Sequence, residues 1–166
     1  MIDAMLHEDH VATLDIINKL EVRIGNGKWD RRLEPSVPSD RLLLEALIAM
    51  MDSEVRHHLP FEEKELFPKL DDFGFEDVTG MLFDEHEAIR SLIASLRPLS
   101  DAALAGGFRE DSWKAFHGFL ADLAGLVIFH IQKEEMGIIS RLRMLLGPDE
   151  CQEMASTYTA LLSKSR

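Results

Sequence analysis

The chain has 166 residues, of which 18 are basic and 30 are acidic, so its formal net charge at pH 7 is −12. This length fits one compact domain, and we expect residues 1–166 to form it. An acidic surface repels phosphate backbones and anionic lipid, so neither nucleic acid nor a membrane is an expected partner. The one cysteine, Cys151, excludes an internal disulfide, and an acidic start without a secretion signal favours a cytoplasmic location.

Apolar residues recur at every third or fourth position along most of the chain, which is the spacing of amphipathic α-helices. Four such stripes span residues 6–24, 44–70, 82–96 and 116–142. No uninterrupted apolar run reaches the roughly 18 residues of a membrane span, and the alternation typical of strands is lacking. We therefore expect an all-α fold, an antiparallel up-down-up-down four-helix bundle with a shorter C-terminal helical segment at residues 149–163.

Glycine, proline and short polar residues mark the expected breaks between these helices. Residues 25–40, which include Trp29, lack periodicity and should form a packed connector. Either Ser39 or Asp40 should cap the start of the second helix. In chain order, the expected breaks are residues 25–27, residues 35–40, residues 71–74, the stretch from Pro98 to Gly107, and Gly147-Pro148.

The first and third helices share a pattern, and so do the second and fourth. His10 and His86 each follow two acidic residues, and each is followed by Ala, Ile and Leu at two, seven and ten residues later. His58 and His130 each begin a His-xxx-Glu-Glu run. The chain therefore reads as one helical hairpin used twice, each copy with one histidine on its first helix and a His-xxx-Glu on its second.

The repeated polar residues fall on the apolar stripes that should face the core. One histidine in such a place is usually a core residue satisfied by hydrogen bonds. Four imidazoles and two carboxylates together would be costly to bury without compensating charge. Metal ions resolve this conflict, because neutral imidazoles and ionised carboxylates become ligands. The predicted metal ligands are His10, His58, Glu62, His86, His130 and Glu134.

The donor set favours two ions over one. Six ligands exceed the needs of a single tetrahedral zinc ion, and they suit two ions that share the carboxylates. Nitrogen and oxygen donors without thiolate favour iron, with manganese or zinc as substitutes. An open coordination position in an apolar pocket would admit O2, nitric oxide or peroxide.

Pro60 lies between His58 and Glu62 and removes one backbone hydrogen bond. It either kinks the helix while both ligands keep a shared face, or restarts the helix and separates them. The fourth helix repeats the pair without a proline, which favours the shared face.

The order of these ligands, together with the Glu-Glu-x-x-Leu-Phe-Pro run that starts at Glu62, resembles the haemerythrin-like (HHE cation-binding) family over residues 6–146. The resemblance implies a four-helix bundle with a non-haem di-iron site formed by the six predicted ligands, its two iron ions joined by an oxo or hydroxo bridge. It also implies roles in binding O2, sensing oxygen or nitric oxide, handling iron, or decomposing peroxide.

One position departs from the oxygen-carrying haemerythrins. They place a further histidine one turn after the third-helix histidine, where this chain has Arg90. A guanidinium does not ligate cations, so we expect Arg90 to snorkel outward or to pair with a carboxylate or a bound anion. This weakens the case for reversible O2 carriage and leaves a position open for peroxide. Family members with arginine here resemble peroxide-decomposing or stress-response proteins.

The other histidines are expected outside the ligand set. His7 is an alternative to His10, although the repeat favours His10. His57 points away from the face of its neighbour and His117 is offset from the stripe, so we expect both at the surface or the rim.

Several further side chains have expected structural roles. Tyr158 could approach the site if the C-terminal segment folds back, although a packing role is favoured, and Cys151 has no catalytic partner near it in sequence. The acidic residues beside the ligands should be mostly solvated, with one or two of them accepting an outer imidazole N–H or pairing with Arg90. These acidic residues are Glu63, Glu85, Glu87 and Glu135.

The leading functional interpretation is a di-iron protein that senses, stores or reacts with a small ligand, with catalase-like or another redox activity if it is an enzyme. The alternative is a non-enzymatic regulatory or interaction domain with structural metal ions. A zinc or manganese hydrolase with a glutamate base ranks last. The expected assembly is a monomer or a homodimer.

Overall fold

The computed structural model describes residues 1–25 and 31–163, and within these ranges it consists of helices and turns without strands. The prediction of an all-α protein is therefore confirmed. Part of the predicted connector, including Trp29, lies outside the described residues. The α-helices are α1 (Ile2–Ile24), α2 (Pro38–Ser53), α3 (Leu59–Phe61), α4 (Phe67–Asp71), α5 (Glu76–Gly106), α6 (Glu110–Gly137) and α7 (Leu142–Ser163).

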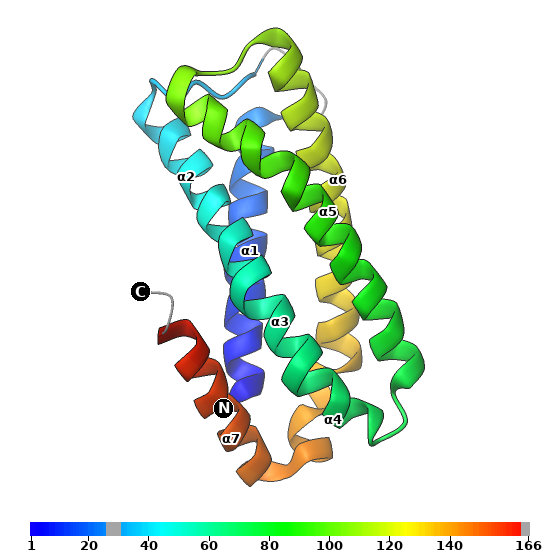
Figure 1. The fold of residues 1–166 in the computed structure, drawn as a ribbon. Coiled ribbons are helices and arrows are strands. Elements are labelled where there is room, and N and C mark those ends of the chain that lie inside the picture. The colour runs from blue at the N-terminus through cyan, green and yellow to red at the C-terminus, as the bar shows by residue number, and fades with distance from the viewer. Residues whose placement is uncertain (26–30, 164–166) are drawn as a thin grey trace.

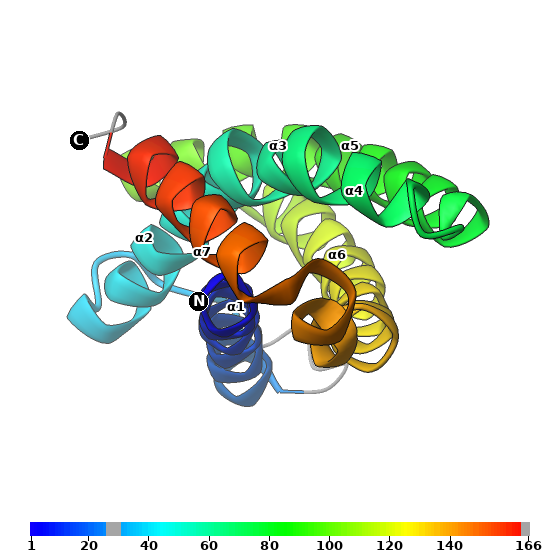
Figure 2. The ribbon, with the colours of Figure 1, turned by 90° about the horizontal axis from the view of Figure 1, so that it is seen from below.

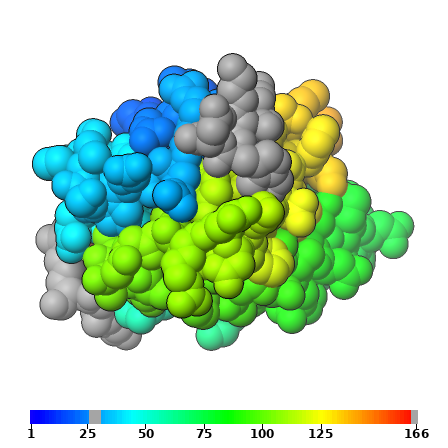
Figure 3. Space-filling view, turned by 90° about the horizontal axis from the view of Figure 1, so that it is seen from above, coloured from blue at the N-terminus to red at the C-terminus, as the bar shows by residue number. Residues whose placement is uncertain are grey.

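The long helices lie lengthwise beside one another, and α2, α3 and α4 together form one continuous rod (Figure 1). α5 packs against both α6 and α2, and α1 contacts α2 and α6. Figure 3 shows the end of the molecule where α2 begins and α5 passes to α6. At the opposite end α7 crosses beside the start of α1 (Figure 2), with which it is in contact.

Two π-helical turns interrupt the rod around the predicted ligands. They are Glu54–His58 and Glu62–Leu66, and each ends two residues before a proline, Pro60 or Pro68. A proline ring clashes with the carbonyl four residues earlier. In each π-helical turn the residue before the proline donates its N–H to the carbonyl five residues earlier. Leu59 donates to the carbonyl of Glu54, and Phe67 donates to the carbonyl of Glu62. The helix therefore continues through Pro60 without restarting, as π-bulges commonly allow.

Two predicted boundaries are wrong. α5 runs through Pro98 to Gly106, so the connection to α6 begins only at Gly107, which has a positive φ of 76°. α6 ends at Gly137, well before Gly147, and a short 3-10 turn, Ile139–Arg141, leads into α7. The apolar stripe continues across this break because Ile138, Ile139 and Leu142 are buried on both sides of it. The predicted break at Gly147-Pro148 is present as a kink inside α7, where Gly147 has a non-helical φ of 75°.

Neither Ser39 nor Asp40 caps the second helix. α2 begins at Pro38 after Val37, and no side chain caps it. A proline suits the first helical position, because its missing N–H needs no partner there. Asp40 is buried and accepts hydrogen bonds from the Arg23 guanidinium at 2.6 and 2.8 Å and from the Glu34 N–H at 2.9 Å. It therefore fastens α2 to the end of α1.

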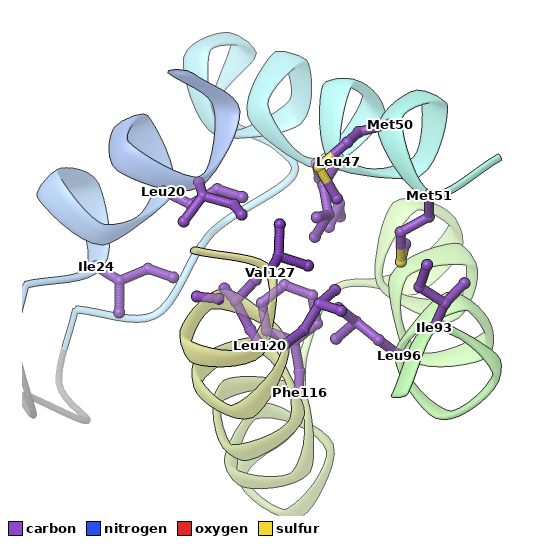
Figure 4. Packing of buried hydrophobic residues seen from close by; sticks show 14 of the residues in the cluster. Leu20, Ile24, Leu47, Met50, Met51, Ile93, Leu96, Phe116, Leu120 and Val127 are labelled. Carbon is purple, nitrogen blue, oxygen red and sulfur yellow. The ribbon is translucent and has the colours of Figure 1, made fainter. Parts of the chain in front are cut away.

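Two apolar clusters fill the interior, one on each side of the predicted ligands. Along α1, Ile2 and Leu6 belong to one cluster and Ile17, Leu20 and Ile24 to the other, with His10 between them. The same order recurs along α5, where His86 lies between the two clusters. Figure 4 shows converging side chains of the larger cluster, which belong to α1, α2, α5 and α6. The predicted ligands are thus walled off from water at both ends.

One described helical stretch, within Glu110–Ser163, has the length and the mean hydropathy, 1.3, of a membrane span, and 39% of that stretch is buried. Core helices meet the same two criteria. α6 supplies most of this apolar character, and nine of its residues, including His130 and Glu134, are buried in the protein.

Candidate metal centre

All six predicted ligands lie in the interior at one level of the structure. Each of the six residues is at most 3% exposed to solvent. They form two groups that share both carboxylates, and within each group the candidate ligand atoms lie within 4.8 Å of one another. The first group is His10, His58, Glu62 and Glu134, and the second is Glu62, His86, His130 and Glu134.

The imidazoles meet in pairs. Nε2 of His10 lies 3.2 Å from Nε2 of His58, and Nε2 of His86 lies 3.2 Å from Nε2 of His130. Two nitrogens that share one ion at about 2.1 Å, at an angle of about 90° to 110°, are separated by roughly 3.0–3.4 Å. The separation within each pair therefore suits two ligands of a single cation.

The two carboxylates reach both pairs. One oxygen of Glu62 lies 3.4 Å from Nε2 of His58, and its other oxygen lies 3.3 Å from Nε2 of His86. Glu134 does the same, with Oε2 at 3.1 Å from Nε2 of His10 and Oε1 at 3.1 Å from Nε2 of His130. None of these four buried oxygens has a hydrogen-bond partner among the described residues. Buried carboxylates without donors are costly, and two cations would satisfy both of them.

Each imidazole also hydrogen-bonds a carboxylate through its outer nitrogen, Nδ1. These carboxylates immediately precede or follow a predicted ligand in the sequence. With an N–H donated from Nδ1, a neutral imidazole keeps its lone pair on Nε2, the nitrogen that would bind a metal ion. The pairs are His10 with Glu135 (2.6 Å), His58 with Asp9 (3.3 Å), His86 with Glu63 (2.8 Å) and His130 with Glu85 (2.9 Å).

The outer carboxylates follow the sequence repeat. Asp9 and Glu85 occupy equivalent positions, and each holds the second histidine of its own copy. Glu63 and Glu135 are also equivalent, and each holds the first histidine of the other copy. The two copies therefore interlock. Because Arg90 stands in place of a further histidine, each group has two imidazoles of its own and the two shared carboxylates.

The two inner carboxylates set the charge state of the imidazoles in the metal-free protein. Burial lowers the pKa of His86, but Glu134 and Glu62 outweigh burial and raise it to about 10. Burial also lowers the pKa of His58, but the Glu62 carboxylate outweighs burial and holds this pKa well above its usual range. Burial raises the pKa of Glu134, but the imidazoles of His10 and His130 hold it well below its usual range. Protons therefore occupy the place of cations, and metal binding must displace them.

Arg90 pairs with carboxylates and does not point at the candidate ligands. Its guanidinium lies 2.7 Å from Glu63 and 2.7 Å from Glu87. Because Glu63 also accepts from His86, Arg90 supports the carboxylate that orients this imidazole. Pairing with a carboxylate is one of the two arrangements predicted for Arg90.

The remaining histidines lie outside the two groups. His7 is exposed and contacts Glu135 from outside at 3.1 Å, whereas His10 occupies the interior position. His57 is half-buried and belongs to neither group. His117 lines a cavity of about 110 Å³ between α1 and α6, together with Ile17 and Leu120.

Sequence reasoning underestimated the outer residues. One or two of the four acidic residues beside the ligands are expected to accept an imidazole N–H or to pair with Arg90. Three of them, Glu63, Glu85 and Glu135, accept imidazole N–H groups, and the side chains of Glu63 and Glu85 are only 14% and 15% exposed. Asp9 was not singled out, although its equivalence to Glu85 in the repeat is visible in the sequence.

Tyr158 does more than pack. It is buried, its ring lies 4.6 Å from the ring of Phe61, and its hydroxyl donates to Asp9. Burial and the Asp9 carboxylate raise the pKa of Tyr158, so the phenol keeps its proton. Cys151 is buried among apolar residues of α7 and its neighbours, away from the ligands.

Comparisons with known proteins agree with this site. Residues 1–142 match the Hemerythrin HHE cation binding domain, which includes all six predicted ligands. A protein named DNA nickase from Nostoc sp. (strain PCC 7120) is 25% identical over 107 residues, which are 64% of this chain and 28% of that protein. No solved structure matches the chain. With the match across residues 1–142 and the two groups of His and Glu ligand atoms, the chain belongs to the Hemerythrin HHE cation-binding family and is a metal-binding protein.

Proposed function

We propose that the two groups hold two iron ions and that O2, nitric oxide or peroxide binds to this centre or reacts there. One observation carries the proposal: each inner carboxylate directs one oxygen to each imidazole pair, and none of these oxygens accepts a hydrogen bond from the described residues. Carboxylates that span two imidazole pairs fit two ions better than one.

The donors favour iron among the available metals. Four imidazole nitrogens and two carboxylates, without thiolate, suit iron, manganese or zinc, and of these iron supplies redox chemistry with O2 and peroxide. Glutamates and histidines on facing helices are an established way to hold a di-iron centre within a helical bundle. We also propose that the helices form the antiparallel up-down-up-down bundle that this ligand arrangement requires.

The chain's own residues create the setting for that chemistry. Bound iron would supply one-electron or two-electron redox chemistry and an open coordination position. The two apolar clusters exclude water from both ends of the site, and the outer carboxylates orient the imidazoles. Without a third imidazole at position 90, each ion would have only two imidazoles and two shared carboxylates as protein ligands, which would leave room for a small ligand.

We propose that α7 belongs to the same domain, although residues 143–166 extend beyond the family match. Its Tyr158 is buried and donates to Asp9 on α1, so the end of the chain completes the surroundings of His58. The coverage of 28% of the Nostoc protein gives no support for transferring its named activity to this acidic chain.

Anaerobic loading of the metal-free protein with Fe²⁺, followed by metal analysis and an absorption spectrum, tests the proposal. We expect two irons per chain and a spectrum that changes on addition of peroxide or nitric oxide. Glu62→Ala should abolish loading, whereas Glu65→Ala, an exposed glutamate in the same turn, should not. Two tightly bound ions without any spectral response to these ligands would favour structural metals instead. Less than one iron per chain would contradict the proposal.

A further inference from the structure

The repeat allows the two proposed metal positions to be compared residue by residue. We call the position beside His10 and His58 site A and the position beside His86 and His130 site B. Both share Glu62 and Glu134, so their inner donors are the same. Any difference between them must come from the groups that surround these donors.

Both outer carboxylates of site B are paired with permanent cations. Glu63, which holds His86, receives the Arg90 guanidinium at 2.8 Å. Glu85, which holds His130, receives the Lys133 ammonium. The positive charges of Arg90 and Lys133 therefore offset the negative charges of the two carboxylates beside site B.

Among residues 1–25 and 31–163, no lysine or arginine pairs with the outer carboxylates of site A. Asp9, which accepts from His58, also accepts a hydrogen bond from the neutral phenol of Tyr158. Glu135, which holds His10, is contacted by His7, which is exposed and charged only when protonated.

The sequence repeat explains why the two sites differ. The position equivalent to Lys133 is Phe61, and its ring packs against Tyr158, with 4.6 Å between ring centroids. The position equivalent to Arg90 is Leu14. Both cations beside site B therefore correspond to apolar residues beside site A.

A further carboxylate lies on the side of site A. Glu54 precedes His58 by one turn of the rod and accepts a hydrogen bond from Thr13 at 2.9 Å. The equivalent residues beside site B are Leu126 and Ile89, both apolar. Site A thus has more uncompensated negative charge around it than site B.

We propose that the two metal positions have unequal affinity and that site A binds its cation first and more tightly. This inference rests on the proposed function, because it presupposes two occupied positions. Negative charges near a metal cation strengthen its binding. Replacement of the groups that hold the metal ligands typically changes affinity about 10-fold to 100-fold. We expect the two binding steps to differ by about tenfold or more.

Stepwise titration of the metal-free protein with Co²⁺, followed by absorption and calorimetry, tests the inference. Two resolved steps are expected. Lys133→Met should tighten the second step several-fold, because it exposes site B to the full charge of Glu85. Lys114→Met is the matched control, since Lys114 is an exposed lysine on the same helix, paired with Glu110. It should leave both steps unchanged.

A second pair of variants assigns the steps to the sites. Asp9→Asn and Glu85→Gln are equivalent changes in the two copies, and each new amide oxygen can still accept the imidazole N–H. Asp9→Asn should weaken the first step by about tenfold or more, and Glu85→Gln should weaken the second. Equal affinities in the unmodified protein, or the same response to both lysine substitutions, would overturn the inference while leaving two bound ions. Failure to bind any Co²⁺ would instead contradict the proposed metal centre.

Discussion

Tyr158, near the end of the last helix, donates its hydroxyl hydrogen bond to Asp9, in the first helix, and Asp9 in turn accepts from Nδ1 of His58. This chain of contacts joins a part of the protein outside the family match to a predicted ligand. It also provides a test of how far the surroundings of the site extend.

Tyr158→Phe should lower the free energy of unfolding by about 1–2 kcal/mol, because it removes the donor to a partly buried carboxylate. Two bound metal ions are still expected, with a small shift in the absorption of the loaded protein. Chemical denaturation and the loaded spectrum measure both effects. Ser156→Ala, which removes an exposed hydroxyl from the same helix, is the control and should change neither. An unfolding free energy equal in the two variants would show that the Asp9 contact contributes nothing.

The two partners of Arg90 should differ in their effect on metal binding. Glu63→Gln is expected to weaken metal binding about 10-fold to 100-fold, because Glu63 orients His86 as well as pairing with Arg90. Glu87→Gln should have little effect, since Glu87 is exposed and pairs only with Arg90 among the contacts that the structure shows for it. Competition with a chelator of known affinity compares the two. Equal losses would mean that the pairing of Arg90, and not the orientation of His86, governs binding.

Pro60 should matter for the site more than another proline within a helix. Pro60→Ala removes the reason for the wide turn that ends at His58, so we expect His58 to shift relative to Glu62 and metal binding to weaken about tenfold. Pro98→Ala, inside α5 and remote from the ligands, should leave binding unchanged. Metal titration and circular dichroism together distinguish lost binding from lost helix. Unchanged metal affinity in Pro60→Ala would show that the π-helical turn does not determine the ligand geometry.

The metal-free protein should lose stability as pH rises. The pKa of His86 is raised from 6.5 to about 10 in the folded state, so its protonated form stabilises folding. That contribution is complete below about pH 6.5 and disappears as pH rises through about 10. Denaturation with a chelator present should therefore give a lower unfolding free energy at pH 9 than at pH 6.5. His86→Gln should reduce this dependence, and a slope unaffected by the substitution would contradict the assigned cause.

The repeat made much of the site accessible to sequence reasoning. Four histidines and two glutamates on apolar stripes predicted the residues that the structure brings together, because helix periodicity determines which positions face the core. The helix boundaries were less accessible. Pro98 was expected to end a helix but lies within α5, and Gly137 ends α6 although the buried stripe continues past it.

The surroundings of the site were the hardest part to predict. The π-helical turns depend on how Pro60 and Pro68 are accommodated, which the apolar spacing does not show. The contact between Tyr158 and Asp9 requires α7 to fold back beside α1, and no periodic signal encodes that return. Short-range patterns therefore predicted the inner groups, whereas the outer contacts depend on the tertiary packing.

The most direct test of the central claim is anomalous diffraction at the iron absorption edge from crystals of the iron-loaded protein. We expect two peaks, one beside Nε2 of His10 and His58 and one beside Nε2 of His86 and His130, with Glu62 and Glu134 between them. A single peak, or no peak near these imidazoles in protein shown to be loaded, would contradict the account.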